Sequence, residues 1–529
     1  MTDLVSSSSL SHKLIRNTFF NFVGRSWAML ITLFLTPYIV SKLGMQRFGV
    51  WSLILVITSY VGLLDLGLGA SFVKYVAEYH AQKDYEAINR VFNSGLALCL
   101  ILSLVIVAAG FVLRDPILGL FKIPTELFAD ARFVLLVAVV IYSLSNVFGI
   151  FQAVVTGLQR MDVANLIVLG VSVLRILGTV LFLELRYDLR GLIVNEALVF
   201  ALRALLLVLS AFHLLPQLQV GWVFYHRHSL RQLLSYGIKV QVSHLADLAS
   251  SQTDKLLLGY FLGLRPVAFY ELGSRVVLTS KRLSRVLISA IVPAASEIDA
   301  REDRLSLCRL YLRGSKYLVL VVAPILLFIA AAAPLILAAW MGEGYELSVP
   351  VIQLLALGHL VHLLTGVGTT IAKGMGKPEY ETRYSLLLLA MNTLLGIILV
   401  IRLGFWGVLI ATPLSLIVSS LYFMVLFHRL LGIPLLQFLK DTYLQPVIIC
   451  LLAGLPFLTL NAVALQTLQA QGKLVNLAIL GAEGLLFVAI YGGLMLKTAY
   501  LDDYDRRLLI RLGRSLLRAQ SGWTCPLSS

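Results

Sequence analysis

The sequence predicts an all-α membrane protein with fourteen transmembrane helices, forming two parallel six-helix repeats around a central cleft plus two extra C-terminal helices. Hydrophobic residues make up 59% of the 529 positions and charged residues only 13%, about half of the charged fraction of a soluble domain. Apolar runs of about 20 residues, long enough to cross a bilayer as helices, recur along the chain. In addition, the first half of the chain is similar to the second.

The apolar runs define the predicted helices in order, and none shows the period-2 alternation of a barrel strand. They cover residues 17–41, 47–72, 91–113, 132–156, 163–185, 191–214, 232–261, 266–293, 315–340, 348–372, 383–401, 405–428, 443–465 and 474–496. The expected organisation is a cytoplasmic N-terminus (1–16), a first six-helix lobe (17–214), a cytoplasmic linker (215–231), a second lobe (232–428), two additional helices (443–496) and a basic cytoplasmic tail (497–529).

Basic residues are concentrated in alternate loops, and this orients the predicted helices. Residues 281–316 include eight Lys and Arg, whereas the loop Gly342–Ser348 has none. Because cytoplasmic loops carry the excess of basic residues, both termini are expected inside the cell. The net charge of +15 then reflects this bias together with attraction to anionic membrane lipid. For the amphipathic, basic tail 501–518, a helix on the inner leaflet and a partner-binding segment both remain open.

Several other classes of protein are not expected. No soluble basic segment is long enough to form a nucleic-acid-binding domain. The four cysteines lack the spacing of a metal site or a disulfide framework; they are Cys99, Cys308, Cys450 and Cys525. The first apolar run is too long for a signal peptide, so no cleavage is expected.

The repeat becomes visible when the chain is shifted by 219 residues, with small gaps further downstream. The aligned pairs include Leu43/Leu262, Gly44/Gly263, Trp51/Tyr270, Glu78/Glu297, Asp84/Asp303, Gly157/Gly374 and Gly191/Gly407. Because six is an even number, both copies enter the membrane in the same orientation, and their pseudo-twofold axis is expected along the membrane normal. Two such bundles facing a cleft are typical of alternating access.

Four stretches of the chain carry a resemblance to a known family. They are LGxxxFGxWSL from Leu43, LLDLGLG from Leu63, KYVAEYHAQKDYEAINRVFNSG from Lys74 and TGLQRMDVAN from Thr156. The chain resembles the polysaccharide biosynthesis (Wzx-type) flippases of the multidrug/oligosaccharidyl-lipid/polysaccharide exporter superfamily. The resemblance implies movement of an undecaprenyl-pyrophosphate-linked oligosaccharide from the inner to the outer leaflet of a bacterial plasma membrane, for O-antigen or exopolysaccharide. It implies no cofactor, and it implies lipid-linked oligosaccharide and other polysaccharide assembly proteins as partners.

Cationic residues within the predicted helices are candidates for binding the substrate head group. Each charged group costs about 2.5 to 3.5 kcal/mol at a helix centre, so it is usually retained for function. Arg25 is the first candidate for the pyrophosphate, because a guanidinium presents a planar fork of donors to phosphate oxygens. Lys239, Lys255 and Arg275 are the further candidates. The resemblance implies a cationic cavity in such flippases but names no single residue.

Acidic residues and one histidine are candidates for ion coupling or for lining the cleft. Asp247 and Asp254 lie with Lys239 on one polar stripe of the run 232–261, which lines the cleft or holds the bundles together. His244 is on the same run. Asp65, beside two glycines, either caps a helix end or titrates and couples transport to a proton or sodium gradient.

Glu271 stands four residues before Arg275, the favourable order for a local ion pair, and it is also a candidate for the cleft lining. No metal-ligand cluster, phosphate-binding loop or nucleophile motif is present in the sequence, so the chain is expected not to be an enzyme.

The predicted function is therefore a flippase of lipid-linked oligosaccharide repeat units that works by alternating access. A gradient-driven multidrug or small-molecule antiporter of the same superfamily is the first alternative, against which the cations within the spans argue. A membrane polysaccharide polymerase or ligase is the second alternative. It would be favoured by a large outside loop with catalytic residues, and no predicted outside loop exceeds about 20 residues, the length of a single span.

Overall fold

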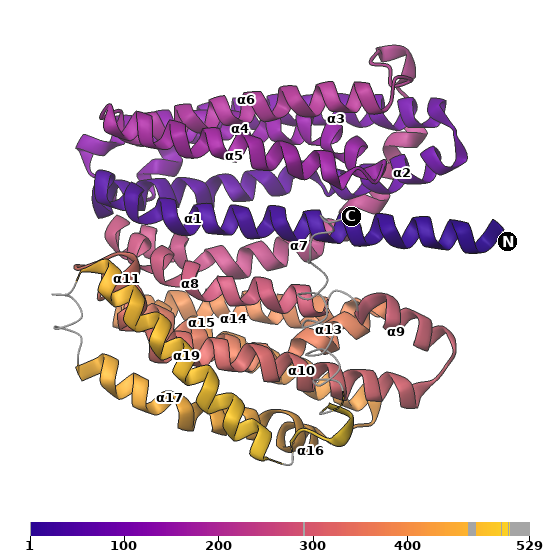
Figure 1. Cartoon of the computed structure of the whole chain (residues 1–529). Helices are drawn as coiled ribbons and strands as arrows, with labels where there is room; N and C mark the ends of the chain where they lie inside the picture. Colours follow the sequence, from indigo (N-terminus) through magenta and orange to yellow (C-terminus); the bar gives the residue numbers. More distant parts are fainter. Residues whose placement is uncertain (1, 289–290, 464–471, 499, 506, 508–529) are drawn as a thin grey trace, which may run out of the picture. The chain divides into compact units, whose positions relative to one another are not determined.

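The computed structural model describes residues 2–288, 291–463, 472–498, 500–505 and 507 (Figure 1). The described residues form helices and connecting turns and contain no strand, as the sequence predicts. Contacts divide the chain into two compact units. Unit 1 comprises Met1–Gly273 and Thr382–Ser415, and unit 2 comprises Ser274–Glu381 and Leu416–Ser529. These units differ from the two repeat lobes, which stay a prediction.

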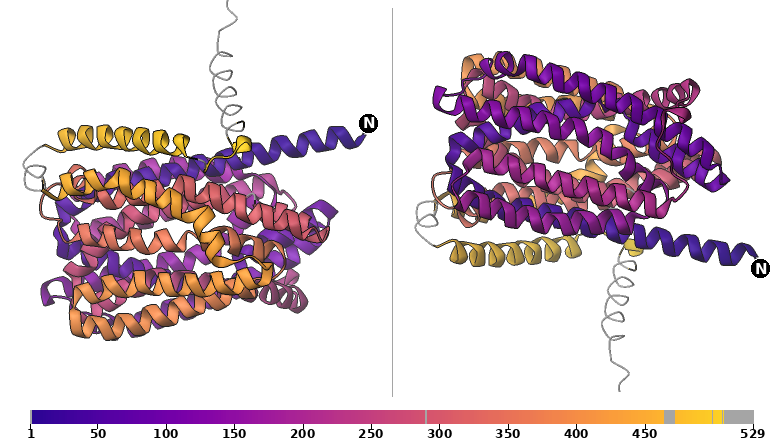
Figure 2. Two further views of the ribbon diagram at one scale, coloured as in Figure 1. Left: turned by 90° about the horizontal axis from the view of Figure 1, so that it is seen from below. Right: turned by 90° about the horizontal axis from the view of Figure 1, so that it is seen from above.

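Unit 1 is built mainly from the helices of the first half of the chain. They are α1 (Thr2–Gly62), η1 (Leu63–Asp65), α2 (Leu68–Gln82), α3 (Tyr85–Gly119), α4 (Thr125–Gly157), α5 (Met161–Glu184), α6 (Asp188–Leu214), η2 (Trp222–Phe224), α7 (Arg227–Phe261), the start of α8 (Leu264–Ile288), most of α14 (Glu379–Leu403) and the start of α15 (Phe405–Leu431). Helices α3 to α6 run side by side in the different views (Figures 1 and 2). Phe72, Phe92 and Phe151 are buried among them and form their core.

Unit 2 contains the remaining helices. They are the rest of α8, α9 (Ile291–Ala300), α10 (Arg304–Ala331), α11 (Ala333–Trp340), α12 (Ser348–His362), α13 (Thr365–Gly374), the rest of α15, α16 (Leu435–Phe438), the π-helix η3 (Leu439–Leu444), α17 (Gln445–Val463) and α19 (Lys473–Lys497). The two helices outside the repeat are α17 and α19. Phe328 of α10 packs against Phe457 of α17 and Phe487 of α19, so the two additional helices share a core with unit 2.

The described helices make this a multi-pass membrane protein. Ten of them are long and apolar enough to cross a membrane, and the bent pair α12 and α13 raises the number to eleven if it is one span. The predicted runs 17–41 and 47–72 both begin within α1, which breaks at Gly44 into two helices. Helices α7 and α8, which carry several charged residues, are not among the ten. The total of fourteen stays a prediction.

Three predicted runs are interrupted for local reasons. The run 47–72 ends as a helix at Gly62 and continues through η1 into the separate helix α2. The run 315–340 is divided between α10 and α11, and α11 has Pro334 in its first turn, where a proline starts a helix well. The run 348–372 bends by 44° between α12 and α13, where the Thr365 hydroxyl donates to the His362 carbonyl at 2.8 Å.

Two aligned pairs of the repeat have the same local geometry. Gly44 and Gly263 both have positive φ, 75° and 91°, and each lies where one long helix gives way to the next. Asp84 and Asp303 each cap a helix, because each side chain accepts a hydrogen bond at 2.9 Å from the backbone N–H three residues later. These pairs support the repeat that the sequence predicts.

Candidate functional site

Asp65 lies in the tight turn that joins α1 to α2. Its Oδ1 accepts a hydrogen bond from the Gly67 N–H at 2.9 Å, and the turn passes through left-handed φ at Leu66 (55°) and Gly67 (70°). A Cβ on Gly67 would overlap the carbonyl oxygen of Gly237 in α7, so only glycine fits there. The contact supports the capping interpretation of Asp65, while a coupling role stays a prediction.

A second predicted acid, Asp254, lies at the meeting point of four helices of unit 1. Its side chain on α7 is buried, and its two oxygens accept hydrogen bonds from the Tyr270 hydroxyl of α8 and, at 3.0 Å, from the Asn392 amide of α14. Thr412 of α15 bonds to it as well. The buried Asn392 Oδ1 has no hydrogen-bond partner among the described residues. Asp254, Tyr270, Asn392 and Thr412 are called the Asp254 cluster below.

The next residue, Lys255, forms a buried ion pair with Glu271 of α8. The two side chains are 8% and 12% exposed, and the Lys255 ammonium also donates to Gln252 at 3.0 Å. Lys255 is a predicted head-group ligand, and its charge is already neutralised by Glu271. Among the described residues no cation forms an ion pair with Asp254, whose partners are neutral donors.

Three further ionisable residues come together between α4, α5 and α6. They are not among the site residues that the sequence predicts. Arg175 of α5 pairs with Glu196 of α6 at 2.9 Å. Arg203, two turns further along α6, donates to the neutral Gln152 of α4 at 2.7 Å. Arg203 has no carboxylate partner in the described part of the chain, so the group has one unbalanced positive charge. Arg175, Glu196 and Arg203 are called the Arg203 group below.

A sequence signal for this group does exist. Glu196 and Arg203 are seven residues apart in α6, which places them on one face of the helix. Nothing in the spacing, however, connects them with Arg175 on α5 or with Gln152 on α4. Those contacts depend on how three separate helices are rotated against each other.

The side chains of several predicted residues lie outside the described residues. Arg25 belongs to α1, and Lys239, His244 and Asp247 belong to α7, so their backbones are helical. Arg275 is half-buried on α8, one turn after Glu271. Their proposed roles stay predictions. No described group of three His, Cys, Asp or Glu residues could hold a metal ion.

The sequence matches the model of one protein family. The sequence model described as "Polysaccharide biosynthesis protein" matches residues 14–299, which is more than half of the chain. The chain belongs to this family. The match includes most of α1 and all of α2 to α8, and therefore the Arg203 group and Asp254.

Known proteins resemble the chain over most of its length. A putative O-antigen transporter from Shigella flexneri is 21% identical over 423 residues, or 79% of this chain and 99% of the relative. The fold resembles that of an inward-facing multidrug resistance MATE family transporter of the MOP superfamily, with a TM-score of 0.67 and 17% identity over 76% of this chain and 94% of that chain. It also resembles the lipid II flippase MurJ in its inward closed conformation, with a TM-score of 0.63 and 16% identity over 90% of this chain and 100% of that chain.

These likenesses show that the chain shares the fold of the two solved structures. The named relatives are transporters and a flippase, which agrees with the expectation that the chain is not an enzyme.

Proposed function

We propose that this protein moves undecaprenyl-pyrophosphate-linked oligosaccharide repeat units from the inner to the outer leaflet of a bacterial plasma membrane, by alternating access. Membership of the polysaccharide biosynthesis family and the likeness to an O-antigen transporter support this proposal. The observation that carries it is Arg203, a guanidinium within an apolar helix whose described partner is a neutral amide. An unbalanced cation is expensive inside a membrane, and it suits an anionic substrate.

The Arg203 group is the proposed contact for the anionic head group in unit 1. Glu196 holds Arg175 in place, and Arg203 keeps its charge and most of its donors for a phosphate. Arg25, Lys239, Lys255 and Arg275 are proposed to assist. Of these, Lys255 would first have to leave Glu271, so it ranks last.

Asp254 is the proposed coupling residue. Its hydrogen-bond donors are neutral and it forms no ion pair within the described residues, so the gain of a proton or a small cation would change the charge of this buried carboxylate. The further candidates for ion coupling or for lining the cleft are Asp65, Asp247, His244 and Glu271. We further propose that both termini are cytoplasmic. Anionic membrane lipid and other polysaccharide assembly proteins are the proposed partners besides the substrate.

The decisive experiment measures movement of a labelled lipid-linked oligosaccharide across vesicles that contain the purified protein. The wild type should move it, and Arg203→Gln should reduce the rate at least about tenfold, as expected for the loss of one charge-assisted contact. Arg190→Gln is the matched control, because Arg190 is on the same helix but is 55% exposed and paired with Asp130. No movement by the wild type under any imposed gradient would remove the flippase proposal.

Two acid variants separate coupling from capping. Asp254→Asn keeps the shape of the side chain, and we expect transport driven by a proton or sodium gradient to disappear in this variant. Asp65→Asn keeps an acceptor for the Gly67 N–H, so transport should persist if Asp65 only caps the turn. Loss of coupling in Asp65→Asn, together with normal coupling in Asp254→Asn, would reverse the two assignments.

A gradient-driven small-molecule antiporter is the second candidate, favoured by the TM-score of 0.67 with the MATE transporter. Export of a cationic dye that competes with the oligosaccharide would support it. Dye export that is unaffected by Arg203→Gln would favour it over the flippase.

A further inference from the structure

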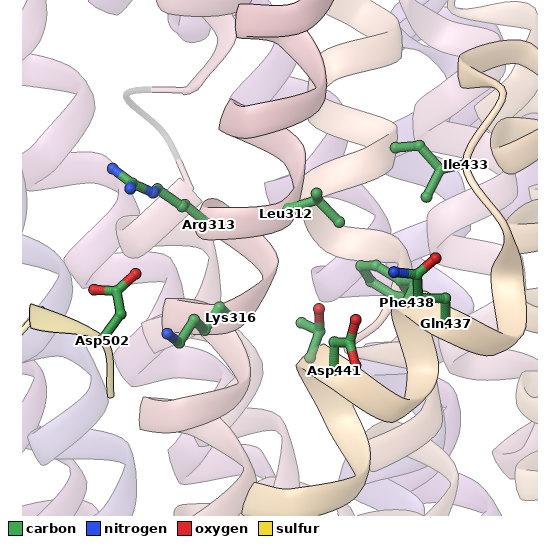
Figure 3. Close-up of a pocket in the computed structure, with 9 residues that line it drawn as sticks. Leu312, Arg313, Lys316, Ile433, Gln437, Phe438, Asp441 and Asp502 are labelled. Carbon is green, nitrogen blue, oxygen red and sulfur yellow. The ribbon is translucent and has the colours of Figure 1, made fainter. Parts of the chain in front are cut away.

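Unit 2 contains a cavity of about 350 Å³ that the proposed transport mechanism does not use (Figure 3). One wall is α10, which contributes Leu312, Arg313 and Lys316. The facing wall includes Phe438 of α16 and Asp441 of the π-helix η3. A π-helix is wider than an α-helix and is often found at functional sites. The cavity therefore has apolar and charged groups from elements far apart in the sequence.

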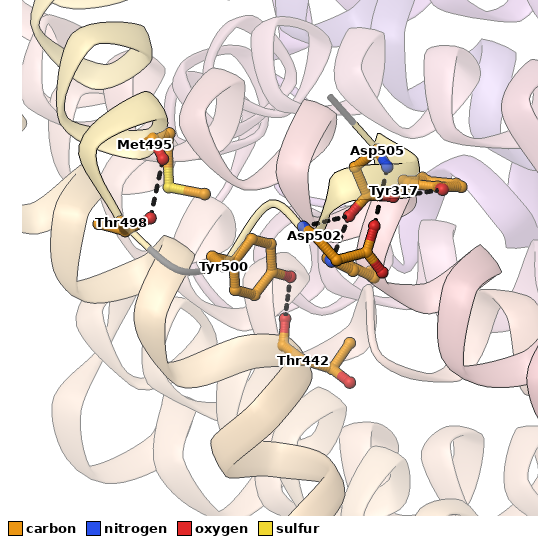
Figure 4. Close-up of polar contacts among 8 residues, drawn as sticks. Tyr317, Thr442, Met495, Thr498, Tyr500, Asp502 and Asp505 are labelled. Atoms are coloured by element: carbon orange, nitrogen blue, oxygen red, sulfur yellow. Dashed lines mark hydrogen bonds and ion pairs between the residues drawn. The ribbon is translucent and has the colours of Figure 1, made fainter. Parts of the chain in front are cut away.

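Asp502 of residues 500–505, called the C-terminal strap here, also lines the cavity, and Figure 4 shows the polar contacts of this strap. The Tyr500 hydroxyl donates to the Thr442 carbonyl of η3 at 2.7 Å. Asp505 accepts hydrogen bonds from the Lys316 ammonium at 2.5 Å and from the Tyr317 hydroxyl at 2.6 Å. Burial acts to raise the pKa of Asp505, but these donors outweigh it and hold the pKa below its usual range. The strap is therefore anchored by an ionised carboxylate at neutral pH.

The charged residues that line the cavity differ in whether they have a counter-ion. Lys316 is neutralised by Asp505. The guanidinium of Arg313 lies 4.3 Å from the centre of the Tyr504 ring and has no carboxylate partner within the described ranges. Asp441 likewise has no hydrogen-bond or ion-pair partner there. Arg313, Asp441 and Asp502 thus line the same cavity without a counter-ion in the described part of the chain.

We propose that this cavity binds a zwitterion that carries a phosphate and a primary ammonium, as in the head group of an aminophospholipid. The guanidinium of Arg313 would hold the phosphate, because its planar fork suits phosphate oxygens. The carboxylate of Asp441 would accept hydrogen bonds from the ammonium. Leu312 and Phe438 provide an apolar wall for the carbon atoms of the ligand next to its phosphate.

The position along the chain favours a membrane source for this ligand. Arg313 and Lys316 end the basic segment 281–316, which is expected on the cytoplasmic side, so the cavity is expected at the level of the inner head groups. Tyr500 and Tyr504 contact the lining residues Thr442 and Arg313, Tyr317 bonds to Asp505, and tyrosines are enriched at the membrane interface. A soluble phosphate–ammonium compound has the same chemistry, and the experiment must distinguish the two sources.

The test is a binding titration of the purified full-length protein in detergent with short-chain phosphatidylethanolamine, phosphatidylglycerol and soluble phosphoethanolamine. Phosphatidylethanolamine should bind about tenfold more tightly than phosphatidylglycerol, which has no ammonium for Asp441. Binding of the lipid but not of phosphoethanolamine identifies the membrane as the source. Equal binding of both identifies a head-group site that a soluble zwitterion can also fill.

Variants of Arg313 and Asp441 test how much each charge contributes to lipid binding. Asp441→Asn should remove the preference for phosphatidylethanolamine, and Asp503→Asn, at an exposed acid outside the cavity lining, should keep it. Arg313→Gln should weaken both lipids about tenfold, whereas Arg309→Gln, one turn earlier on α10, should not. Arg313→Lys keeps the charge without the fork and should lie between wild type and Arg313→Gln. An unchanged lipid preference in Asp441→Asn, or equal losses in the Arg309 and Arg313 variants, would overturn the proposal.

Discussion

Two groups of charged residues in unit 1 differ in the sign of the charge that is left without a counter-ion and in the exposure of their ion pairs. In the Arg203 group, Arg175 and Glu196 neutralise each other and one cation is left over; the paired side chains are 43% and 30% exposed. Around Asp254, Lys255 and Glu271 neutralise each other while nearly buried, and one carboxylate is left among neutral donors.

The difference in exposure and sign indicates different tasks. A half-exposed group with a spare cation can receive an anion from outside without first losing its own contacts. An enclosed carboxylate with all its donors in place is poorly suited to a large substrate, but a proton or small cation changes its charge fully. The comparison therefore supports the proposal that the first group binds the substrate and that the second couples transport to an ion gradient.

The largest expected effect is on stability, at Lys255. Lys255→Met removes a buried counter-ion of Glu271, and we expect a loss of about 3 to 5 kcal/mol, seen as a lower thermal midpoint in detergent. The double variant Lys255→Met/Glu271→Leu should recover most of this loss. As a control, Lys42→Met removes an exposed pair with Glu184 and should change stability little. A small effect of Lys255→Met would contradict an enclosed, stabilising ion pair between Lys255 and Glu271.

A smaller effect is expected at Tyr270, which donates to Asp254. Tyr270→Phe removes one buried hydrogen bond and should cost about 1 to 2 kcal/mol of stability. It should also shift the pH dependence of transport upward, because the ionised form of Asp254 loses a donor and its proton affinity rises. Tyr260→Phe, at an exposed ring on α7, is the control for both measurements. An unchanged pH profile would contradict a coupling role for Asp254.

The smallest stability effect is expected at Arg175. Arg175→Met leaves Glu196 without its ion pair, but the Glu196 side chain is 30% exposed against 12% for Glu271, so we expect a smaller loss than in Lys255→Met. Transport should nevertheless fall, since Glu196 is then free to pair with Arg203 and compete with the substrate. If Arg175→Met were as destabilising as Lys255→Met, the two groups would be equally enclosed and the comparison would fail.

Much of the local structure follows from the sequence. The repeat aligns Gly44 with Gly263, and both adopt the positive φ at which one helix ends and another begins. It also aligns Asp84 with Asp303, and both cap helices. These features depend on neighbouring residues only, because a cap or a glycine turn is satisfied within about one turn of helix.

The sequence by itself determined that the chain is helical, crosses a membrane many times and carries costly charges within its helices, because hydrophobicity and helix length are local properties. Only the tertiary structure decided which charges meet. The spacing predicts a local pair of Glu271 with Arg275 on the same helix, but it does not indicate the ion pair of Glu271 with Lys255 on another helix. Arg203, too, finds its amide partner on a different helix. Such contacts depend on the rotation and depth of whole helices, which the hydropathy of a single helix does not encode.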